Sequence, residues 1–103
     1  MAMIIDGFSH FLPKPFAEEL YRAHPTDELR ELASFDYFSD VENRIRVLDK
    51  HKIDKQIITL ARPSIWLDLP RDIVFKMTRS ANDKLTDAAR KFPDRLIPVG
   101  TLP

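Results

Sequence analysis

The stretch IIDGFSHFLPKP, residues 4–15, carries an acidic residue and a histidine close together near the start of the chain. An apolar pair precedes Asp6, as at the end of a buried strand, and His10 stands shortly before two prolines. Side chains two positions apart on a strand share a face, so Asp6, Phe8 and His10 would lie together. A carboxylate and an imidazole can hold a metal ion, whereas the phenyl ring of Phe8 offers no lone pair. The pattern leaves open whether this is a metal site that lacks one ligand or no metal site.

The composition is that of one small globular domain, with 103 residues, of which 44% are hydrophobic and 31% charged. The 16 basic side chains balance the 16 acidic ones, so we expect neither nucleic acid nor an anionic membrane as a partner. The 2 glycines are too few for a glycine-rich phosphate loop. The absence of cysteine excludes disulfides and thiolate metal sites and fits a cytoplasmic protein. We expect neither a signal peptide nor a membrane span.

Strands and helices are predicted to alternate along the chain. Strands are expected at residues 3–6, 55–61 and 95–103, and the second of them is apolar without alternation, which is typical of a strand buried on both faces. Helices are expected between them, over residues 15–24, 26–33, 39–51 and 70–92. Thr26 is the expected cap of the second helix, and Ser39 with Glu42 forms a capping box before the third.

This order of elements predicts an α/β fold with right-handed crossovers and a parallel sheet. The sequence ends on the third strand, with no helix after it and with an apolar edge left bare, which is a liability for an independent domain. We therefore expect residues 1–103 to be a single N-terminal segment of a larger domain.

Several stretches together resemble the amidohydrolase-related family, which includes aminocarboxymuconate-semialdehyde decarboxylase. The opening is similar to the family's D-x-H-x-H-x-x-P start, and RIRVLDKHKIDKQIIT is similar to its helix leading into the second strand. ANDKLTDAARKFPDRLIPVGTLP resembles its helix with an Ala-Asn-Asp run, followed by P-D-R-F/L and a strand ending in L-P. The resemblance implies a TIM (β/α)8 barrel of the metal-dependent hydrolase type with its active site at the C-terminal ends of the strands. This chain would supply the first three βα units, so the barrel is expected to be incomplete.

The resemblance also assigns roles at the opening. His10 matches the second histidine of the motif and is the expected metal ligand, whereas Phe8 occupies the other ligand position and cannot ligate. Asp6 matches the acidic residue and is expected to orient the site. The family's divalent ion, Zn²⁺ or Mn²⁺, polarises a carbonyl or carboxylate group or activates water. The remaining ligands and the catalytic residues would lie beyond Pro103, so metal binding by this chain alone is expected to be weak at most.

Four other positions have weaker signals. Arg62 and Trp66 follow the second strand and are candidates for substrate contact, with a surface arginine and an aromatic cover for the sheet edge as the alternatives. His24 and His51 are expected at exposed helix ends, where an imidazole interacts well with the helix dipole.

Two function classes follow. One is the N-terminal part of a metal-dependent decarboxylase or hydrolase that acts on a small carboxylate or carbonyl substrate, inactive as this chain alone. The other is a degenerate or truncated paralogue without catalysis that forms oligomers or binds a partner. The apolar strands and the bare edge predict a homo-oligomer in either case.

Overall fold

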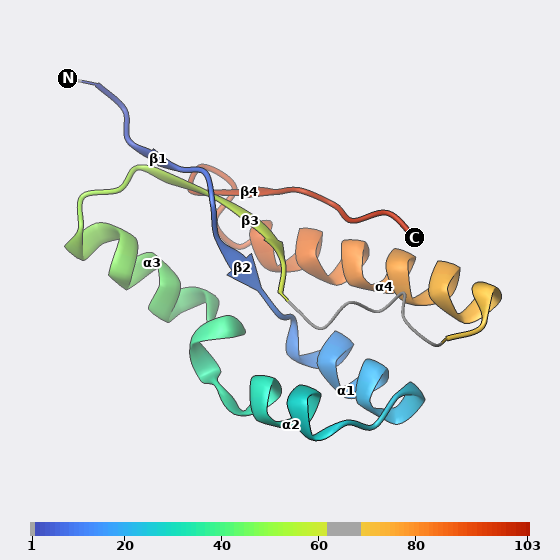
Figure 1. The fold of residues 1–103 in the computed structure, drawn as a ribbon. Helices are drawn as coiled ribbons and strands as arrows, with labels where there is room; N and C mark the ends of the chain where they lie inside the picture. The colour runs from blue at the N-terminus through green and yellow to red at the C-terminus, as the bar shows by residue number, and fades with distance from the viewer. Residues whose placement is uncertain (1, 62–68) are drawn as a thin grey trace.

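The computed structural model describes residues 2–61 and 69–103 (Figure 1). The elements in chain order are β1 (Ile5–Asp6), β2 (His10–Phe11), α1 (Lys14–Ala23), α2 (Asp27–Ser34), the 3-10 helix η1 (Asp36–Phe38), α3 (Val41–Lys50), β3 (Lys55–Leu60), α4 (Arg71–Ala89) and β4 (Leu96–Pro98). The predicted alternation of strands and helices is therefore confirmed. None of the helices in these two ranges is long and apolar enough to cross a membrane.

The strands form one parallel sheet with β3 in the centre. The backbone N–H groups of Lys55 and Thr59 donate toward the β1–β2 segment, whereas that of Gln56 donates to the carbonyl of Arg95 on the opposite side. β1 and β2 therefore lie along one edge of β3, and β4 lies along the other. The third strand is shorter than predicted, because only residues 96–98 pair with β3.

The first strand is interrupted by a bulge. Asp6 pairs with Gln56 and His10 pairs with Thr59, so the three residues 7–9 lie opposite only two residues, 57 and 58. One extra residue between two paired positions is the signature of a β-bulge. The prediction of one shared face for residues 6, 8 and 10 is therefore wrong, because the bulge places Asp6 on the Gln56 side of the sheet and His10 on the Thr59 side.

Helices cover only one face of this sheet. Gln56 and Ile58 of β3 face the helices and are 8% and 0% exposed, whereas Ile57 and Thr59, which alternate with them, are only partly buried. The expected burial of β3 on both faces is therefore wrong, and so is the expected buried first strand, because Ile5 is 48% exposed. The physical reason is that the described part of the chain has helices packed on one side alone.

The core has two parts that meet at α4. One joins α3, α4 and the helix-facing side of the sheet, and its fully buried members include Leu48, Ile58 and Leu96. The other joins α1, α2 and the first half of α4 around Phe16 and Leu29. Residues of α4 belong to both parts, so α4 is the element that joins them (Figure 1).

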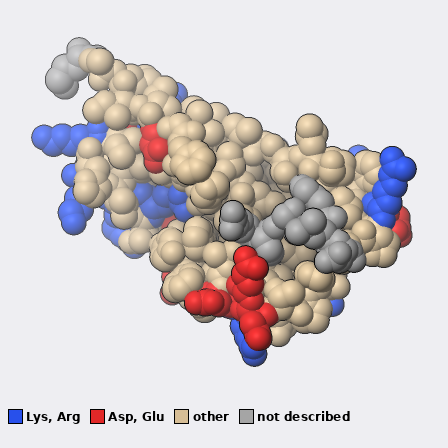
Figure 2. Space-filling model, viewed as in Figure 1, with Lys and Arg blue, Asp and Glu red and all other residues tan. Residues whose placement is uncertain are grey.

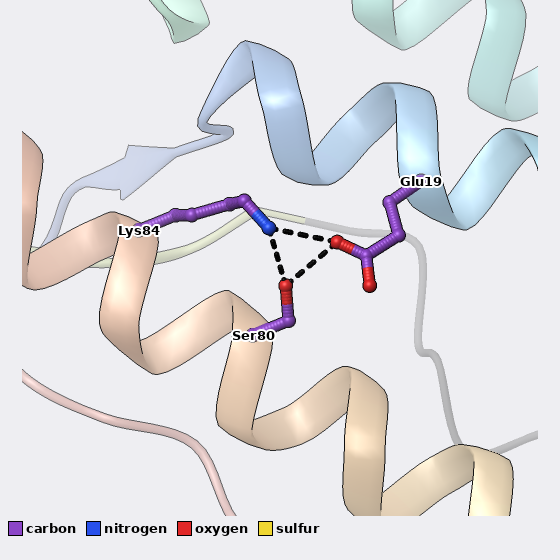
Figure 3. Close-up of polar contacts among 3 residues, drawn as sticks. All are labelled: Glu19, Ser80 and Lys84. Carbon is purple, nitrogen blue, oxygen red and sulfur yellow. Dashed lines mark hydrogen bonds and ion pairs between the residues drawn. The ribbon is translucent and has the colours of Figure 1, made fainter.

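A polar cluster also joins α1 to α4. Glu19 of α1 accepts hydrogen bonds from the Ser80 hydroxyl and the Lys84 ammonium of α4, each at 2.7 Å, and Lys84 Nζ lies 2.6 Å from Ser80 Oγ (Figure 3). We call these three residues the Glu19 cluster. The hydrogen bond from Lys84 holds the pKa of Glu19 below its ordinary value, although burial opposes this effect.

The predicted helix starts are partly confirmed. Thr26 caps α2, since its hydroxyl oxygen accepts from the backbone N–H of Leu29 at 3.1 Å. The predicted capping box at Ser39 is wrong. Asp40 is the N-cap of α3 and accepts from the N–H of Asn43 at 2.8 Å, which places a carboxylate at the positive end of the helix.

Candidate functional site

His10 and Phe8 lie together near the carboxyl ends of the strands. Their ring centroids are 5.0 Å apart with the planes at 76°, an edge-to-face contact, and Phe8 is 83% exposed. His10 is exposed and pairs with Thr59, the residue before the last one of β3. Ligands of parallel α/β proteins bind beyond the carboxyl ends of the strands, so these two rings occupy the place where such a site is built.

The His10 ring contacts β3 through Thr59. Its Nδ1 lies 3.3 Å from Thr59 Oγ1, and the same hydroxyl donates a hydrogen bond of 2.8 Å to the carbonyl of Ser9. The backbone N–H of Thr59 donates to that carbonyl as well, at 3.2 Å. The ring is therefore held to the neighbouring strand by one edge.

Asp6 faces away from this ring and takes part in a partly buried chain of polar contacts. Its Oδ2 accepts from Gln56 Nε2 at 2.8 Å, and its Oδ1 accepts from the backbone N–H of Phe8 at 3.1 Å. Gln56 Oε1 in turn accepts from Arg44 Nη1 at 3.0 Å. Asp6 is thus connected to the His10 segment through the bulge and through Arg44, and its expected orienting role stays a prediction.

Arg44 of α3 is the centre of this chain of contacts. Its Nη1 donates to Ser9 Oγ at 2.7 Å, and its Nη2 donates to the carbonyls of His10 at 2.8 Å and Tyr37 at 3.1 Å. The guanidinium carbon lies 5.2 Å from the centre of the Phe11 ring. We call Asp6, Ser9, Arg44 and Gln56 the Arg44 cluster; it fixes the backbone on both sides of the bulge.

Burial shapes the electrostatics of Arg44. It lowers the pKa of the guanidinium, and the nearby Asp6 carboxylate opposes this effect. The Nε atom is buried without a hydrogen-bond partner in the described part of the chain. Arg44 was not predicted from the sequence, although a signal exists. It lies within the apolar stripe formed by Val41, Ile45 and Leu48. An arginine that faces the core in this way is expected to have polar partners there.

The residues present do not make a complete metal site. Across residues 2–61 and 69–103 there is no group of three or more His, Cys, Asp or Glu side chains that could hold an ion. A catalytic zinc site takes about three protein ligands, and His10 could provide one of them. Phe8 provides none, and Asp6 points to the opposite face.

The remaining predictions from the sequence concern Arg62, Trp66, His24 and His51. Arg62 and Trp66 fall outside the described residues. His24 and His51 are the C-caps of α1 and α3, at the expected helix ends. Asn82 of α4 exchanges hydrogen bonds with the backbone of Thr101, at 3.0 and 2.8 Å, which is a packing role.

A hollow with a volume of about 920 Å³ lies at the amino ends of the strands. Two of its charged residues pair with each other: Arg95 contacts Asp49 at 2.8 Å, and Arg95 also donates to the backbone carbonyl of Asp54 at 2.7 Å. The Asp54 carboxylate accepts from the N–H of Ile4 at 2.7 Å. These contacts hold the amino ends of the strands together, as is typical of the N-terminal face of a barrel, where residues contribute to stability.

No family model matches the chain. A curated relative, the gamma-resorcylate decarboxylase of Rhizobium sp. (strain MTP-10005), is 27% identical over 88 residues, which are 75% of this chain and 27% of that protein. The chain therefore spans little more than a quarter of the length of this relative.

Two solved structures extend the comparison. The 2,6-dihydroxybenzoate decarboxylase from Rhizobium is 28% identical with a TM-score of 0.74, and the match covers 100% of this chain and 31% of that one. The 5-carboxyvanillate decarboxylase from Novosphingobium aromaticivorans DSM 12444, complexed with manganese and 4-hydroxy-3-methoxy-5-nitrobenzoic acid, has a TM-score of 0.73 at 24% identity over 97% of this chain and 34% of that one. The predicted barrel-type α/β fold is confirmed by these matches, and the described strands form an open part of it.

Proposed function

From the confirmed resemblance to the amidohydrolase-related family, we propose that this chain is the part of a metal-dependent decarboxylase that carries His10. The substrate class is a hydroxylated benzoate, because the relatives described above are decarboxylases of such acids. This choice favours decarboxylation over hydrolysis. The observation that carries the proposal is the match to 2,6-dihydroxybenzoate decarboxylase along the whole chain. It is supported by an exposed His10 near the carboxyl ends of the strands.

The chain alone is proposed to be inactive. Its described residues offer one imidazole near the carboxyl ends of the strands and no three-ligand cluster, so no reaction step is assigned to a bound ion. The family's divalent ion would have to take further ligands from outside the described residues. A cytoplasmic location and the boundaries of the domain also remain predictions from the sequence.

Manganese provides a sensitive test, because the paramagnetic ion broadens NMR signals near it even when it binds weakly. We expect added Mn²⁺ to broaden the signals of His10 and its neighbours more than those of His24 and His51, and the effect to disappear in His10→Ala. We expect no loss of 2,6-dihydroxybenzoate in the same sample. If the signals of His10 are broadened no more than those of His24 and His51, the proposal that His10 binds the ion is overturned. Turnover by this chain would overturn the proposed inactivity.

A second candidate function is a non-catalytic, self-associating protein. It is favoured by the uncovered side of the sheet and its margins, where apolar side chains remain exposed: Met3, Ile4, Ile5, Phe8, Ile97 and Val99. The view in Figure 2 likewise shows a surface of mostly uncharged side chains, with Lys and Arg mainly around its margin. Exposed apolar surface of this kind is typical of an interface.

Sedimentation equilibrium over a wide concentration range tests the second candidate. A homo-oligomer is expected, and Ile97→Lys, which places a charge on the uncovered face, should shift it toward the monomer. Val47→Lys is the matched control, because Val47 is a similarly exposed apolar side chain on α3. A monomer at all concentrations would exclude this candidate.

A further inference from the structure

We propose that Thr59 is a positioning residue that holds His10 in the Nδ1–H tautomer and leaves the lone pair of the ring on Nε2. The proposal starts from two contacts of one hydroxyl group. Thr59 Oγ1 donates to the Ser9 carbonyl at 2.8 Å and lies 3.3 Å from His10 Nδ1. A threonine hydroxyl has one proton and two lone pairs, so it can donate to only one of these two neighbours.

The distances decide which neighbour receives the proton. The contact with the Ser9 carbonyl is half an ångström shorter and lies near the usual length of an O–H···O bond, whereas 3.3 Å is long for a hydrogen bond. With the hydroxyl proton directed at Ser9, Oγ1 faces Nδ1 with a lone pair. A lone pair on Nδ1 would then face another lone pair. The ring therefore carries its proton on Nδ1 and donates it to Thr59.

The backbone around this contact restricts other arrangements. His10 and Thr59 are register partners of β2 and β3, and the Thr59 N–H also donates to Ser9. Arg44 holds the carbonyl of His10 at 2.8 Å and the hydroxyl of Ser9 at 2.7 Å. Thr59 is β-branched, so its side chain has few rotamers to choose from. The hydroxyl that meets the ring is thus fixed from both strands.

The consequence is a defined chemistry at the exposed end of the ring. In a neutral histidine the tautomer is set by the hydrogen bond that the other nitrogen makes. Nε2 then presents its lone pair to a divalent ion or to a hydrogen-bond donor, and it cannot donate a hydrogen bond to a substrate carboxylate. This use of the lone pair rests on the proposed function, whereas the tautomer itself does not.

NMR of the chain labelled with ¹⁵N in its histidines tests the tautomer directly, at a pH where the rings are neutral. Correlations between ring nitrogens and ring carbon-bound protons distinguish a protonated nitrogen from one with a lone pair. We expect His10 to show a protonated Nδ1. His24 and His51 serve as references in the same spectrum, because neither ring makes a hydrogen bond within the described part of the chain. A protonated Nε2 in the unmodified chain would overturn the proposal without further variants.

Two variants assign the effect to the hydroxyl. Thr59→Val keeps the shape and removes the acceptor, so His10 is expected to shift its proton toward Nε2, while Thr59→Ser is expected to retain Nδ1–H. A purely structural role for Thr59 would leave the tautomer unchanged in Thr59→Val, and this result would overturn the proposal. If Thr59→Val does not fold, the unmodified chain and Thr59→Ser still decide it. Failure of the manganese and turnover tests would contradict the proposed function but would leave the tautomer result intact.

Discussion

The Arg44 cluster and the Glu19 cluster both place charged groups between secondary-structure elements, and they differ in the partners that these charged groups contact. In the Glu19 cluster the three side chains satisfy one another, and Glu19 and Lys84 remain 22% and 31% exposed. In the Arg44 cluster the guanidinium is used mainly on backbone carbonyls and neutral side chains of the site segment. One cluster joins two helices, whereas the other determines the shape of the strand that carries His10.

This difference has a physical basis in the bulge. A continuous strand satisfies its own backbone groups through the ladder, but the extra residue between positions 6 and 10 leaves groups that need other partners. Arg44, with several donors in a fixed fork, bonds the backbone carbonyl of His10 and the side-chain hydroxyl of Ser9. The buried charge on α3 thus joins this helix to the strand segment that contains the bulge. The Glu19 cluster, in contrast, consists of contacts among side chains of two regular helices.

The largest effect is predicted for Arg44→Met. The substitution leaves the carbonyls of His10 and Tyr37 and the polar groups of Ser9 and Gln56 without their donor, so we expect a loss of about 3 kcal/mol in the free energy of unfolding. We also expect the NMR signals of His10 to change. Urea unfolding and the ¹⁵N-histidine spectrum of the same sample measure both effects.

Arg46→Met is the matched control, because Arg46 is an exposed arginine on the same helix with one long contact, to Asn43 at 3.4 Å. Its effect should stay within about 0.5 kcal/mol. Arg44→Lys is expected to recover only part of the loss, since an ammonium cannot reproduce the fork. Equal stability of the Arg44→Met and Arg46→Met variants would show that the cluster is no more than a surface contact.

The sequence predicted the regular elements well. The strand expected at residues 55–61, the long helix expected at residues 70–92 and the capping Thr26 follow from local patterns, and the structure confirms all three as β3, α4 and the N-cap of α2. The family motif also identified His10 as the residue near the carboxyl ends of the strands, and its role as a metal ligand stays a prediction. Local periodicity is sufficient for these features because they depend on neighbours along the chain.

The features that the sequence did not predict depend on distant contacts. The bulge is a mismatch between two strands almost fifty residues apart, and no local pattern encodes it. The exposure of Ile5 and the partial burial of Ile57 depend on which side of the sheet the helices cover. Arg62 and Trp66 lie outside the described residues, so their proposed contact with substrate stays a prediction.

A smaller effect is predicted for Glu19→Gln. It removes the charge that Lys84 contacts but leaves an acceptor for the Ser80 hydroxyl, and the side chains are partly exposed. We therefore expect a loss of about 1 kcal/mol in the free energy of unfolding. The His10 signals should not change, because the Glu19 cluster has no contact with the strand segment. A change at His10 as large as that in Arg44→Met would remove the distinction between the two clusters.

The same variant should change the pH dependence of stability. The pKa of Glu19 is lower in the folded chain than its ordinary value of 4.5, so at this side chain the folded state binds protons less readily than the unfolded state. Its stabilising contribution is then complete above pH 4.5 and is lost as the pH falls through the folded pKa. Urea unfolding from neutral to acidic pH should show the two chains converging at the acidic end. A constant difference would mean that the Lys84 hydrogen bond does not act on the ionised form.

The smallest effect is predicted for Ser80→Ala. The hydroxyl lies 2.7 Å from Glu19 and 2.6 Å from Lys84, but these two charged groups keep their direct contact of 2.7 Å without it (Figure 3). Alanine also favours the helix interior more than serine, which offsets part of the lost hydrogen bond. We expect a change in unfolding free energy of no more than about 0.5 kcal/mol. Ser9→Ala gives the comparison, because the Ser9 hydroxyl accepts directly from Arg44 and the loss there should be larger. If Ser80→Ala costs more than Ser9→Ala, then the Glu19 cluster depends on its hydroxyl and is not a simple ion pair between two helices.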